Sequence, residues 1–437
     1  MDWLRSCRDD PEVLMLVVTS TYRRTLDHGL ILRAVEDRED VERLAAFNGQ
    51  IHGPGVAAMT HALILEHPAT RPEHWLFVEE ESSRTIVSAL CLLPWTLRYG
   101  SVSLRAGEMG IVGTLEPYRG RGLVRALNER FSTLLSEGGY LLSHIQGIPY
   151  FYRQFGYDYA MPLEAHWRVE LDTIVNSQPS APRRFHFRPA TVGDIPLLTR
   201  LYRESAALLD IAAERDEEIW PYLLGPSTGT AMVADTWLAL DESGPAGYFR
   251  VAQHGFGSGL IVNEASRLSL EAAEAVLYHL KSIAVERQKP YIRLNLPANS
   301  LLVELARWRG CAAGAAFAWQ LRIPDPALLL TTLAPVLEQR LAASHLASIT
   351  HTLRLNLYRS TIDLRFDTGK LAIVAHASAE PADEVRLPPP LLAPLVTGYR
   401  TFDELARTSH DVSADGPGRA LAAILFPPMQ AFLYTIY

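Results

Sequence analysis

The sequence predicts three domains, each of which mixes helices with a β-sheet, and three observations lead to this fold class. The chain has 437 residues, which is too long for one ordinary hydrophobic core. Hydrophobic residues make up 48% of it and charged residues 21%, as in folded globular proteins. A pattern of strand, acidic turn and amphipathic helix occurs twice, about 155 residues apart, which indicates that a whole domain is duplicated.

The two copies of this pattern begin at residues 30–47 and 185–202. In both, apolar residues surround an arginine (Arg33 or Arg188) and precede an acidic cap region and a helix. With a shift of one residue, Asp40 aligns with Asp194. Residues 1–28 show no clear periodicity, so we interpret them as a loosely ordered leader or an over-long start, with the first domain over residues 29–175.

Composition marks the two domain boundaries. The stretch "NSQPSAPRR" (176–184) has linker composition and precedes a second domain at 183–323, and "IPDP" (323–326) precedes a third domain at 325–437. The third domain begins with a predicted helix and continues with an alternating pattern around Asp367-Thr368-Gly369, which indicates a β-hairpin. Thr401 and Glu404 have the spacing of a capping box, so we expect a small α+β domain.

Charge and cysteine content exclude several classes of protein. The net charge of −8 disfavours a nucleic-acid binder, which needs a basic surface. The three cysteines (Cys7, Cys91 and Cys311) are far apart, which indicates reduced thiols and a cytoplasmic protein. The apolar stretch at 13–18 is too short for a secretory signal, and Pro427-Pro428 interrupt the uncharged segment from Ala420 to Tyr437. We therefore expect a packed C-terminal segment and no membrane anchor.

The stretch "TLEPYRGRGLVRAL" (114–127) joins a predicted strand (108–114) to a predicted helix. The helix is indicated by apolar residues at helical spacing, which are Leu123, Leu127, Phe131, Leu134 and Leu135. Gly138-Gly139 are expected to end it. Free N–H groups at such a junction bind anions, glycines allow close approach to the backbone, and arginines add charge. The residues by themselves leave two interpretations: a phosphate cradle, or a glycine-rich turn with solvated arginines.

A second motif follows at the expected separation. A predicted strand (140–147) leads to "FYRQFGYDYA" (151–160), which places Tyr152, Phe155, Gly156 and Tyr157 at the spacing Y-x-x-F-G-Y. The loop contains Arg119-x-x-Gly122-x-Val124. With both motifs in this order, residues 105–160 resemble the acetyl-CoA motif of the GNAT superfamily of N-acetyltransferases. That motif has glycine or alanine where this chain has Val124.

The loop Arg119-Gly-Arg-Gly-Leu-Val-Arg125 also resembles the R-x-R-G-L-[LV]-R loop of the enhanced-intracellular-survival (Eis-like) branch. The resemblance covers residues 29–437. It implies a mixed α+β and α/β architecture of two tandem GNAT (acyl-CoA N-acyltransferase) domains and a C-terminal SCP2-like domain, similar to sterol carrier proteins. It further implies a homo-oligomer, with a hexamer among the expected assemblies, and the composition described above adds that this protein is cytoplasmic and binds neither nucleic acid nor membrane.

The resemblance implies a mechanism as well: direct transfer of an acetyl group in a ternary complex from acetyl-CoA to a primary amine, without a metal. The acceptor would be a small molecule that is aminoglycoside-, polyamine- or lysine-like. Tyr152 would be the acid, and the terminal carboxylate of Tyr437 the base, although the family usually ends in phenylalanine. The residues expected to bind acetyl-CoA are Val112, Gly113, Thr114, Arg119, Gly120, Arg121, Gly122, Leu123, Val124 and Arg125.

Several alternatives stay open at this point. Tyr152 could be a packed aromatic residue and the tail could be dispensable. The protein could be a CoA-responsive binding or regulatory protein with little turnover. By fold analogy alone, the third domain could bind lipid.

The second copy is predicted to be inactive. Leu268-Ser269-Leu270 occupy the position of the phosphate loop, and Ala306 occupies that of Tyr152. We therefore expect one active site per chain, with the second domain as a scaffold.

The remaining histidines, cysteines and acidic residues indicate no further catalytic or metal site. Four histidines (His52, His61, His67 and His74) lack metal-site spacing and are expected at the surface or in loops, and Cys91 is expected in the core. An acidic set could attract a cationic amine or could form a solvated face; its members are Asp37, Glu39, Asp40, Glu79, Glu80 and Glu81.

Overall fold

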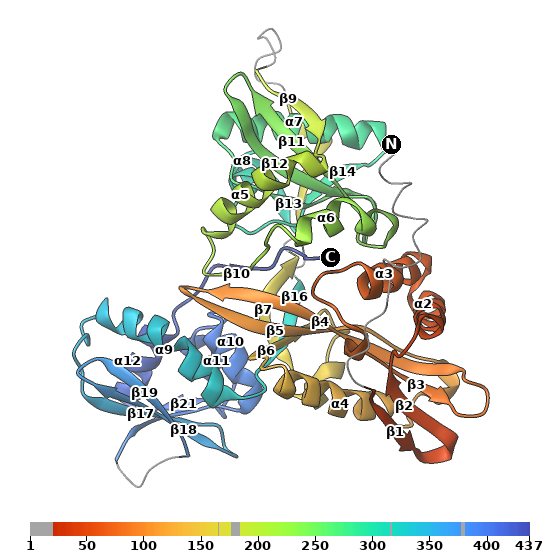
Figure 1. Ribbon diagram of the computed structural model, residues 1–437. Coiled ribbons are helices and arrows are strands. Elements are labelled where there is room, and N and C mark those ends of the chain that lie inside the picture. The colour runs from red at the N-terminus through yellow and green to blue at the C-terminus, as the bar shows by residue number, and fades with distance from the viewer. Residues whose placement is uncertain (1–20, 165, 176–183, 315–316, 377–380) are drawn as a thin grey trace.

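Three units make up the protein in the computed structural model, which describes residues 21–164, 166–175, 184–314, 317–376 and 381–437 (Figure 1). Most of the predicted leader and of the linker at 176–184 lies outside the described residues. The C-terminal end of the chain lies between the first and second units (Figure 1). The structure therefore brings the end of the chain back to the unit that carries the two motifs.

The first unit is built on a ten-stranded sheet. Its main path runs β1-β2-β3-β4-β5-β6-β16-β7, and only the β5–β6 pair on this path is parallel. The strands are β1 (Arg23–Leu26), β2 (Leu30–Ala34), β3 (Trp75–Glu80), β4 (Ile86–Tyr99), β5 (Val102–Thr114), β6 (Leu142–Ile145), β16 (Phe317–Arg322) and β7 (Asp158–Glu164). The assignment of residues 1–28 to a leader is wrong for β1, a polar edge strand whose sequence has no apolar alternation.

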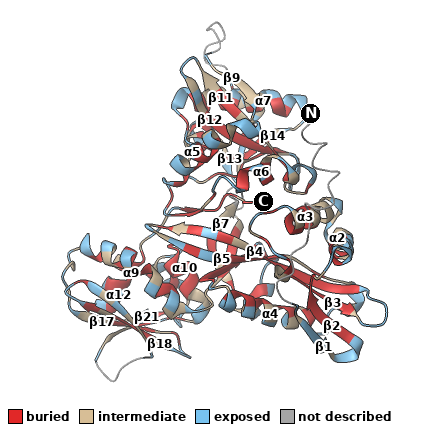
Figure 2. Ribbon diagram, in the orientation of Figure 1, coloured by how far each residue is buried: buried red, intermediate tan, exposed pale blue. Residues whose placement is uncertain are grey.

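Helices cover both faces of this sheet. Helices α2 (Arg38–His52) and α3 (Pro54–Leu65) pack on one face, and α4 (Leu123–Glu137) packs on the other. The five apolar residues that predicted α4 are all buried, and the helix ends before Gly138-Gly139 as expected. Figure 2 shows the burial concentrated in the central strands, and Cys91 lies in this core as predicted.

The second unit repeats the first. Its sheet has the order β15-β8-β14-β13-β12-β11-β9, which places a parallel pair, β13–β14, at the position of β5–β6. The strands are β8 (Trp167–Glu170), β9 (His186–Pro189), β11 (Ala234–Asp241), β12 (Gly244–Ala252), β13 (Leu260–Ala265), β14 (Tyr291–Leu294) and β15 (Ala312–Ala313). The helices are α5 (Ile195–Ala206), α6 (Ile219–Leu224), α7 (Leu270–Glu286) and α8 (Leu301–Trp308).

The two units exchange one strand. Strand β16, from the second copy, lies between β6 and β7 in the first sheet, and β8, from the first copy, lies between β14 and β15 in the second. The predicted limits at 175 and 323 therefore do not separate the two sheets. The composition of a linker indicates where the chain leaves one unit. It does not indicate which sheet a nearby strand will pair with.

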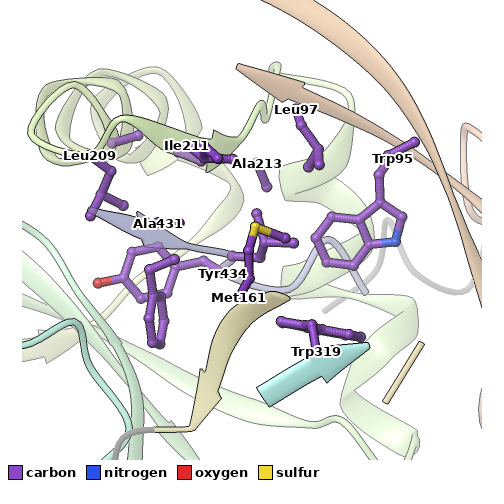
Figure 3. Close-up of a cluster of buried hydrophobic side chains, with 14 of the residues drawn as sticks. Trp95, Leu97, Met161, Leu209, Ile211, Ala213, Trp319, Ala431 and Tyr434 are labelled. Carbon is purple, nitrogen blue, oxygen red and sulfur yellow. The ribbon is translucent and has the colours of Figure 1, made fainter. Parts of the chain in front are cut away.

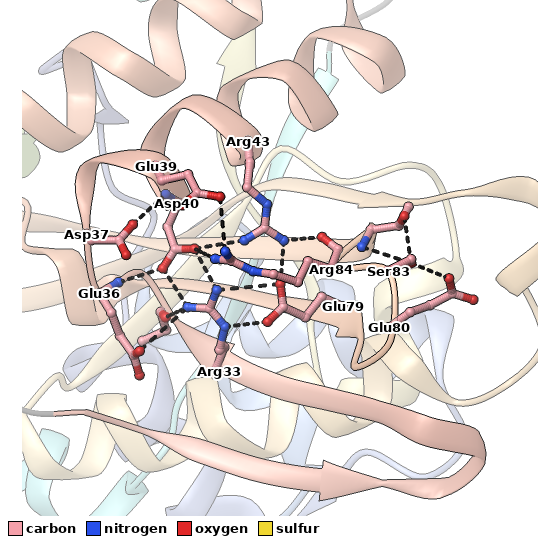
Figure 4. A network of polar contacts seen from close by, with 12 residues as sticks. Arg33, Glu36, Asp37, Glu39, Asp40, Arg43, Glu79, Glu80, Ser83 and Arg84 are labelled. Atoms are coloured by element: carbon pink, nitrogen blue, oxygen red, sulfur yellow. Dashed lines mark hydrogen bonds and ion pairs between the residues drawn. The ribbon is translucent and has the colours of Figure 1, made fainter.

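An ion pair occurs at the same place in both copies. The guanidinium of Arg33 donates to both carboxylate oxygens of Asp40, each at 2.5 Å, and also contacts Glu79 (Figure 4). Arg188 holds Asp194 in the same forked way, at 2.7 and 2.8 Å. The predicted alignment of Asp40 with Asp194 is confirmed. Because Asp40 and Glu79 are buried and paired with arginines, they are not free to attract an amine.

The third unit is the expected small α+β fold. Helix α9 (Pro326–Ala342) leads to a five-stranded sheet of order β19-β18-β17-β20-β21. The remaining elements are β17 (His351–Asn356), β18 (Thr361–Asp367), β19 (Lys370–Ala375), β20 (Asp383–Arg386), α10 (Leu392–Val396), α11 (Phe402–Thr408), β21 (Ser413–Ala414) and α12 (Gly416–Leu425). Thr401 and Glu404 form the predicted capping box of α11.

The C-terminal tail threads between the first two units. Strand β22 (Ala431–Phe432) pairs with β10 (Ile211–Ala213), which itself pairs with the end of β4. Figure 3 shows Ala431 and Tyr434 of the tail among apolar side chains of β4, β7, β10 and β16. The predicted packing of the C-terminal segment is confirmed. Among the described residues, no helix has the length and apolar character needed to cross a membrane.

Candidate active site

Two neighbouring strands of the first sheet separate at its centre. Strands β5 and β6 pair only from Ala106 to Glu108, opposite Leu142 to His144, while β5 continues to Thr114. On its other edge β5 bulges: between the positions that pair with Cys91 and Ala89 it carries one residue more than a regular ladder would place there. Ile111 in this bulge has φ +48°, a conformation that β-branched residues rarely adopt. Beyond Glu108, the bulge and the separation therefore leave the β5 backbone with no paired strand on the β6 side among the described residues.

The beginning of α4 lies beside this backbone. Gly122, the N-cap, is left-handed (φ +76°), and no side chain among the described residues caps the helix. The first helical bond runs from Ala126 N–H to Gly122 O, so the three preceding amides have no partner within the helix. A Cβ at Gly120 or Gly122 would meet nothing within 4 Å. The helix therefore presents free N–H groups and its positive end to open space, as an anion site requires.

A cavity of about 690 Å³ connects these features. It is lined by the β5 backbone segment, the loop before α4, the first turn of α4 and the aromatic segment around η4 (Phe151–Phe155), with Ile51 from α2. Nine of the ten residues predicted to bind the cofactor line it; the tenth, Arg121, stacks instead on the ring of Tyr118, with its guanidinium carbon 4.8 Å from the ring centre. Apart from Tyr152, the other lining residues were not predicted to belong to the site, although Phe155 is part of the quoted motif; they are Ile51, Tyr118, Ile148, Phe151, Gln154 and Phe155.

Tyr152 lines the same cavity. The residue is 6% exposed, and its ring packs against the rings of Phe151 and Phe155. Burial raises the pKa of its phenol further above the ordinary value, so the group stays protonated at neutral pH. The hydroxyl donates to no group among the described residues, so it can donate a proton to a molecule bound in the cavity.

The loop before Tyr152 is held by a residue from the exchanged strand. Gln320 of β16 is buried, and its amide donates to the carbonyl of Gly147 at 2.9 Å. A Cβ at Gly147 would lie 2.2 Å from the ring of Tyr152, so only glycine allows this approach. Neither residue was predicted; the only signal for Gln320 is a polar residue within an apolar strand.

The comparisons with known proteins agree with this geometry. Residues 59–160 match the family model for an acetyltransferase (GNAT) domain, a range that contains β5, the α4 loop and Tyr152. The chain carries a GNAT domain and is an acyltransferase. No curated protein sequence matched the chain.

The acyltransferase also shares its whole-chain fold with solved structures. A GCN5-related N-acetyltransferase from Anabaena variabilis superposes with a TM-score of 0.68 at 19% identity, covering 92% of this chain and 99% of that one. A probable N-acyltransferase from Enterococcus faecalis gives 0.69 at 14% identity, covering 96% and 100%. Eis1 from Mycobacterium abscessus gives 0.62 at 18% identity, covering 93% and 100%. These similarities show that the fold of all three units is shared.

The C-terminal residue lies in the acyltransferase near the point where β5 and β6 separate, but it does not line the described cavity. The hydroxyl of Tyr437 donates to Glu108 Oε1 at 2.8 Å, and the indole N–H of Trp95 donates to the other carboxylate oxygen at 2.9 Å. Glu108 is 3% exposed, and burial raises its pKa to about 7. Glu108 was not predicted as a site residue; its only signal in the sequence is a single carboxylate at the start of the apolar stretch 108–114.

The described part of the second copy shows no equivalent uncapped helix entrance. The hydroxyl of Ser269 caps α7 by accepting from the N–H of Ala272, so one of the free amides is already used. Ala306 is buried, and its carbonyl accepts from Cys311 N–H, as the carbonyl of Tyr152 accepts from Tyr157 N–H. This equivalence supports the predicted alignment and places a methyl group where the first copy has a phenol.

Of the four histidines expected at the surface or in loops, His52 is exposed, and His67 lies in a loop but is not at the surface. His67 is buried and bonds the carbonyl of Ile436 in the tail at 3.1 Å, and burial lowers its pKa to about 4. Within the described parts of the chain, no three side chains of His, Cys, Asp or Glu gather as a metal site would require.

Proposed function

We propose that this acyltransferase moves an acetyl group from acetyl-CoA to a primary amine of a small molecule by direct transfer in a ternary complex. The proposal is carried by one observation: the uncapped entrance of α4 and the phenol of Tyr152 open into a single cavity. Open space in front of Gly120 and Gly122 fits a pyrophosphate against the backbone. Arg119 and Arg125 line the same end of the cavity and add forked donors for phosphate oxygens.

Each residue has a defined part in this reaction. The bound thioester supplies the acetyl group, and the β5 backbone around Val112 and Gly113 lies where it can pair with the cofactor and polarise the carbonyl. Tyr152 gives its proton to the sulfur as the carbon–sulfur bond breaks. The carboxylate of Tyr437 takes a proton from the amine as the nitrogen–carbon bond forms, so that protons and charge balance.

The choice of Tyr437 as the base rests on the packing of the tail. Chain ends usually fray, yet the last residues here are buried between the first two units. A one-residue extension would replace the terminal carboxylate by a neutral amide and would keep the rest of the chain.

The test is the release of thiol from acetyl-CoA with polyamines, aminoglycosides and lysine peptides as acceptors. Tyr152→Phe and the extension should each lower kcat about a hundredfold or more, the usual contribution of a positioned acid or base, with acetyl-CoA affinity unchanged. Tyr150→Phe is the matched control, because Tyr150 is 75% exposed and lies outside the cavity lining, and it should keep full activity. Acetyl-CoA binding without turnover for any amine would instead support a regulatory protein.

We further propose the Eis-like arrangement, with a homo-oligomer and an SCP2-like third unit. The likeness of the whole chain to the fold of Eis1 supports this arrangement. Light scattering on the purified protein tests the oligomer: a molar mass equal to that of one chain would contradict it.

A further inference from the structure

The last eight residues form a strap that is bonded at successive points. The N–H of Gln430 donates to the carboxylate of Asp210 at 2.7 Å, and β22 then pairs with β10. Farther along, the buried guanidinium of Arg215 donates to the carbonyl of Thr435. The carbonyl of Ile436 is bonded by His67, as described above. Both of the first two units therefore hold the strap before its last residue.

The last residue is fixed at both of its ends. At the backbone end, the hydroxyl of Thr435 donates to an oxygen of the terminal carboxylate of Tyr437 at 2.9 Å. At the ring end, the Tyr437 hydroxyl donates to Glu108, and the ring meets Trp95 edge-on with centroids 6.0 Å apart. A displacement of the Tyr437 backbone would strain the hydroxyl bond, because the ring is packed against Trp95 and is joined to the carboxylate through the same Cα.

Burying the carboxylate of Glu108 at this point costs free energy of desolvation. It lies inside the first sheet, at the last β5 position that pairs with β6, where an apolar side chain would avoid desolvation. Each of its carboxylate oxygens accepts one bond, from Tyr437 or from Trp95. The imidazole of His144 approaches the carboxylate only to 4.0 Å. Half of the described hydrogen bonding that compensates this buried carboxylate therefore comes from the end of the chain.

We propose that Glu108 is a positioning residue, which binds the Tyr437 hydroxyl and so holds the terminal carboxylate where β5 and β6 separate. The proposal rests on the proposed function, in which that carboxylate takes the proton of the amine. A phenol bonded to a carboxylate is a charge-assisted pair with a defined direction. Preorganisation of this kind changes the rate of the reaction more than it changes the binding of the cofactor.

Two variants test the anchor. Tyr437→Phe keeps the chain length, the ring and the terminal carboxylate and removes only the hydroxyl, while Glu108→Gln keeps an acceptor and removes the charge. Each should lower kcat about tenfold with the KM for acetyl-CoA unchanged, and the double variant should be no slower than the slower single variant. Tyr99→Phe is the matched control: it removes a buried hydroxyl bond of the same sheet, to the carbonyl of Val396, and should keep full kcat.

A second readout does not need turnover. Carboxypeptidase should release residue 437 about tenfold faster from Tyr437→Phe and Glu108→Gln than from the wild type, because cleavage follows the population of the opened tail. If the variants release it faster while the wild type acetylates no amine, the anchor stands and the proposed function fails. Wild-type kcat and wild-type release in Tyr437→Phe would overturn the anchor. Loss of turnover in Glu108→Gln alone would also overturn it, because Glu108 would then take part in proton transfer itself.

Discussion

The two ends of α4 allow the phosphate cradle to be tested against an internal control. Gly122 precedes the helix with φ +76° and Gly139 follows it with φ +65°. A Cβ on either glycine would meet no atom within 4 Å. Only Gly122 lines the cavity. The substitutions Gly122→Ala and Gly139→Ala therefore impose the same backbone strain, and only one of them places a methyl group in the cradle.

The expected magnitudes separate strain from binding. An alanine in the left-handed region costs about 1–2 kcal/mol, so both variants should lose about that much free energy of unfolding. At Gly122 the methyl group also holds the pyrophosphate away from the helix amides. Since a hydrogen bond to a charged group is worth about 1.5–3 kcal/mol, the loss of one or two such bonds weakens acetyl-CoA binding at least tenfold.

Calorimetric titration with acetyl-CoA and denaturant unfolding measure the two quantities separately. We expect equal destabilisation of the variants and a loss of affinity in Gly122→Ala alone. Equal affinities in the two variants would refute the cradle, and so would a binding stoichiometry of two per chain.

Three other predictions follow from contacts described above. Gly147→Ala should displace the ring of Tyr152 and lower kcat at least tenfold in the thiol-release assay, with little change in acetyl-CoA affinity by calorimetry. Arg33→Met should cost about 3 kcal/mol in denaturant unfolding, because it removes the buried guanidinium and leaves Arg43 as the main cation beside Asp40 and Glu79, whereas Arg188→Met at the exposed equivalent should cost about 1 kcal/mol or less. Burial lowers the pKa of His144 to about 3. Because the unfolded chain takes up this proton near pH 6.5, the free energy of unfolding should be constant above about pH 6.5 and should fall as the pH drops toward 3, by up to about 1.4 kcal/mol per pH unit. His144→Gln should remove that part of the pH dependence, and an unchanged slope would contradict the assignment.

Much of the site could be predicted because its parts are contiguous in the chain. The α4 loop, the glycines before the helix and the apolar spacing within it all lie between residues 114 and 139. Local conformation follows from local residue types, since glycine permits the left-handed turn and the helix period determines which side chains are buried. The duplication could be recognised for the same reason, and the Arg33–Asp40 and Arg188–Asp194 pairs lie at matching places in their copies.

Only the tertiary structure decided which strands pair and what holds the end of the chain. The exchange of β8 and β16 depends on pairing between sheet edges, which is not encoded in the pattern of either strand. Gln320 meets Gly147 across 173 residues, and Tyr437 meets Glu108 across 329. The sequence alone determined α4, the loop before it and the repeat, because short-range conformational preferences produce them. Contacts between distant residues form only when the units pack, since they depend on the arrangement of whole sheets.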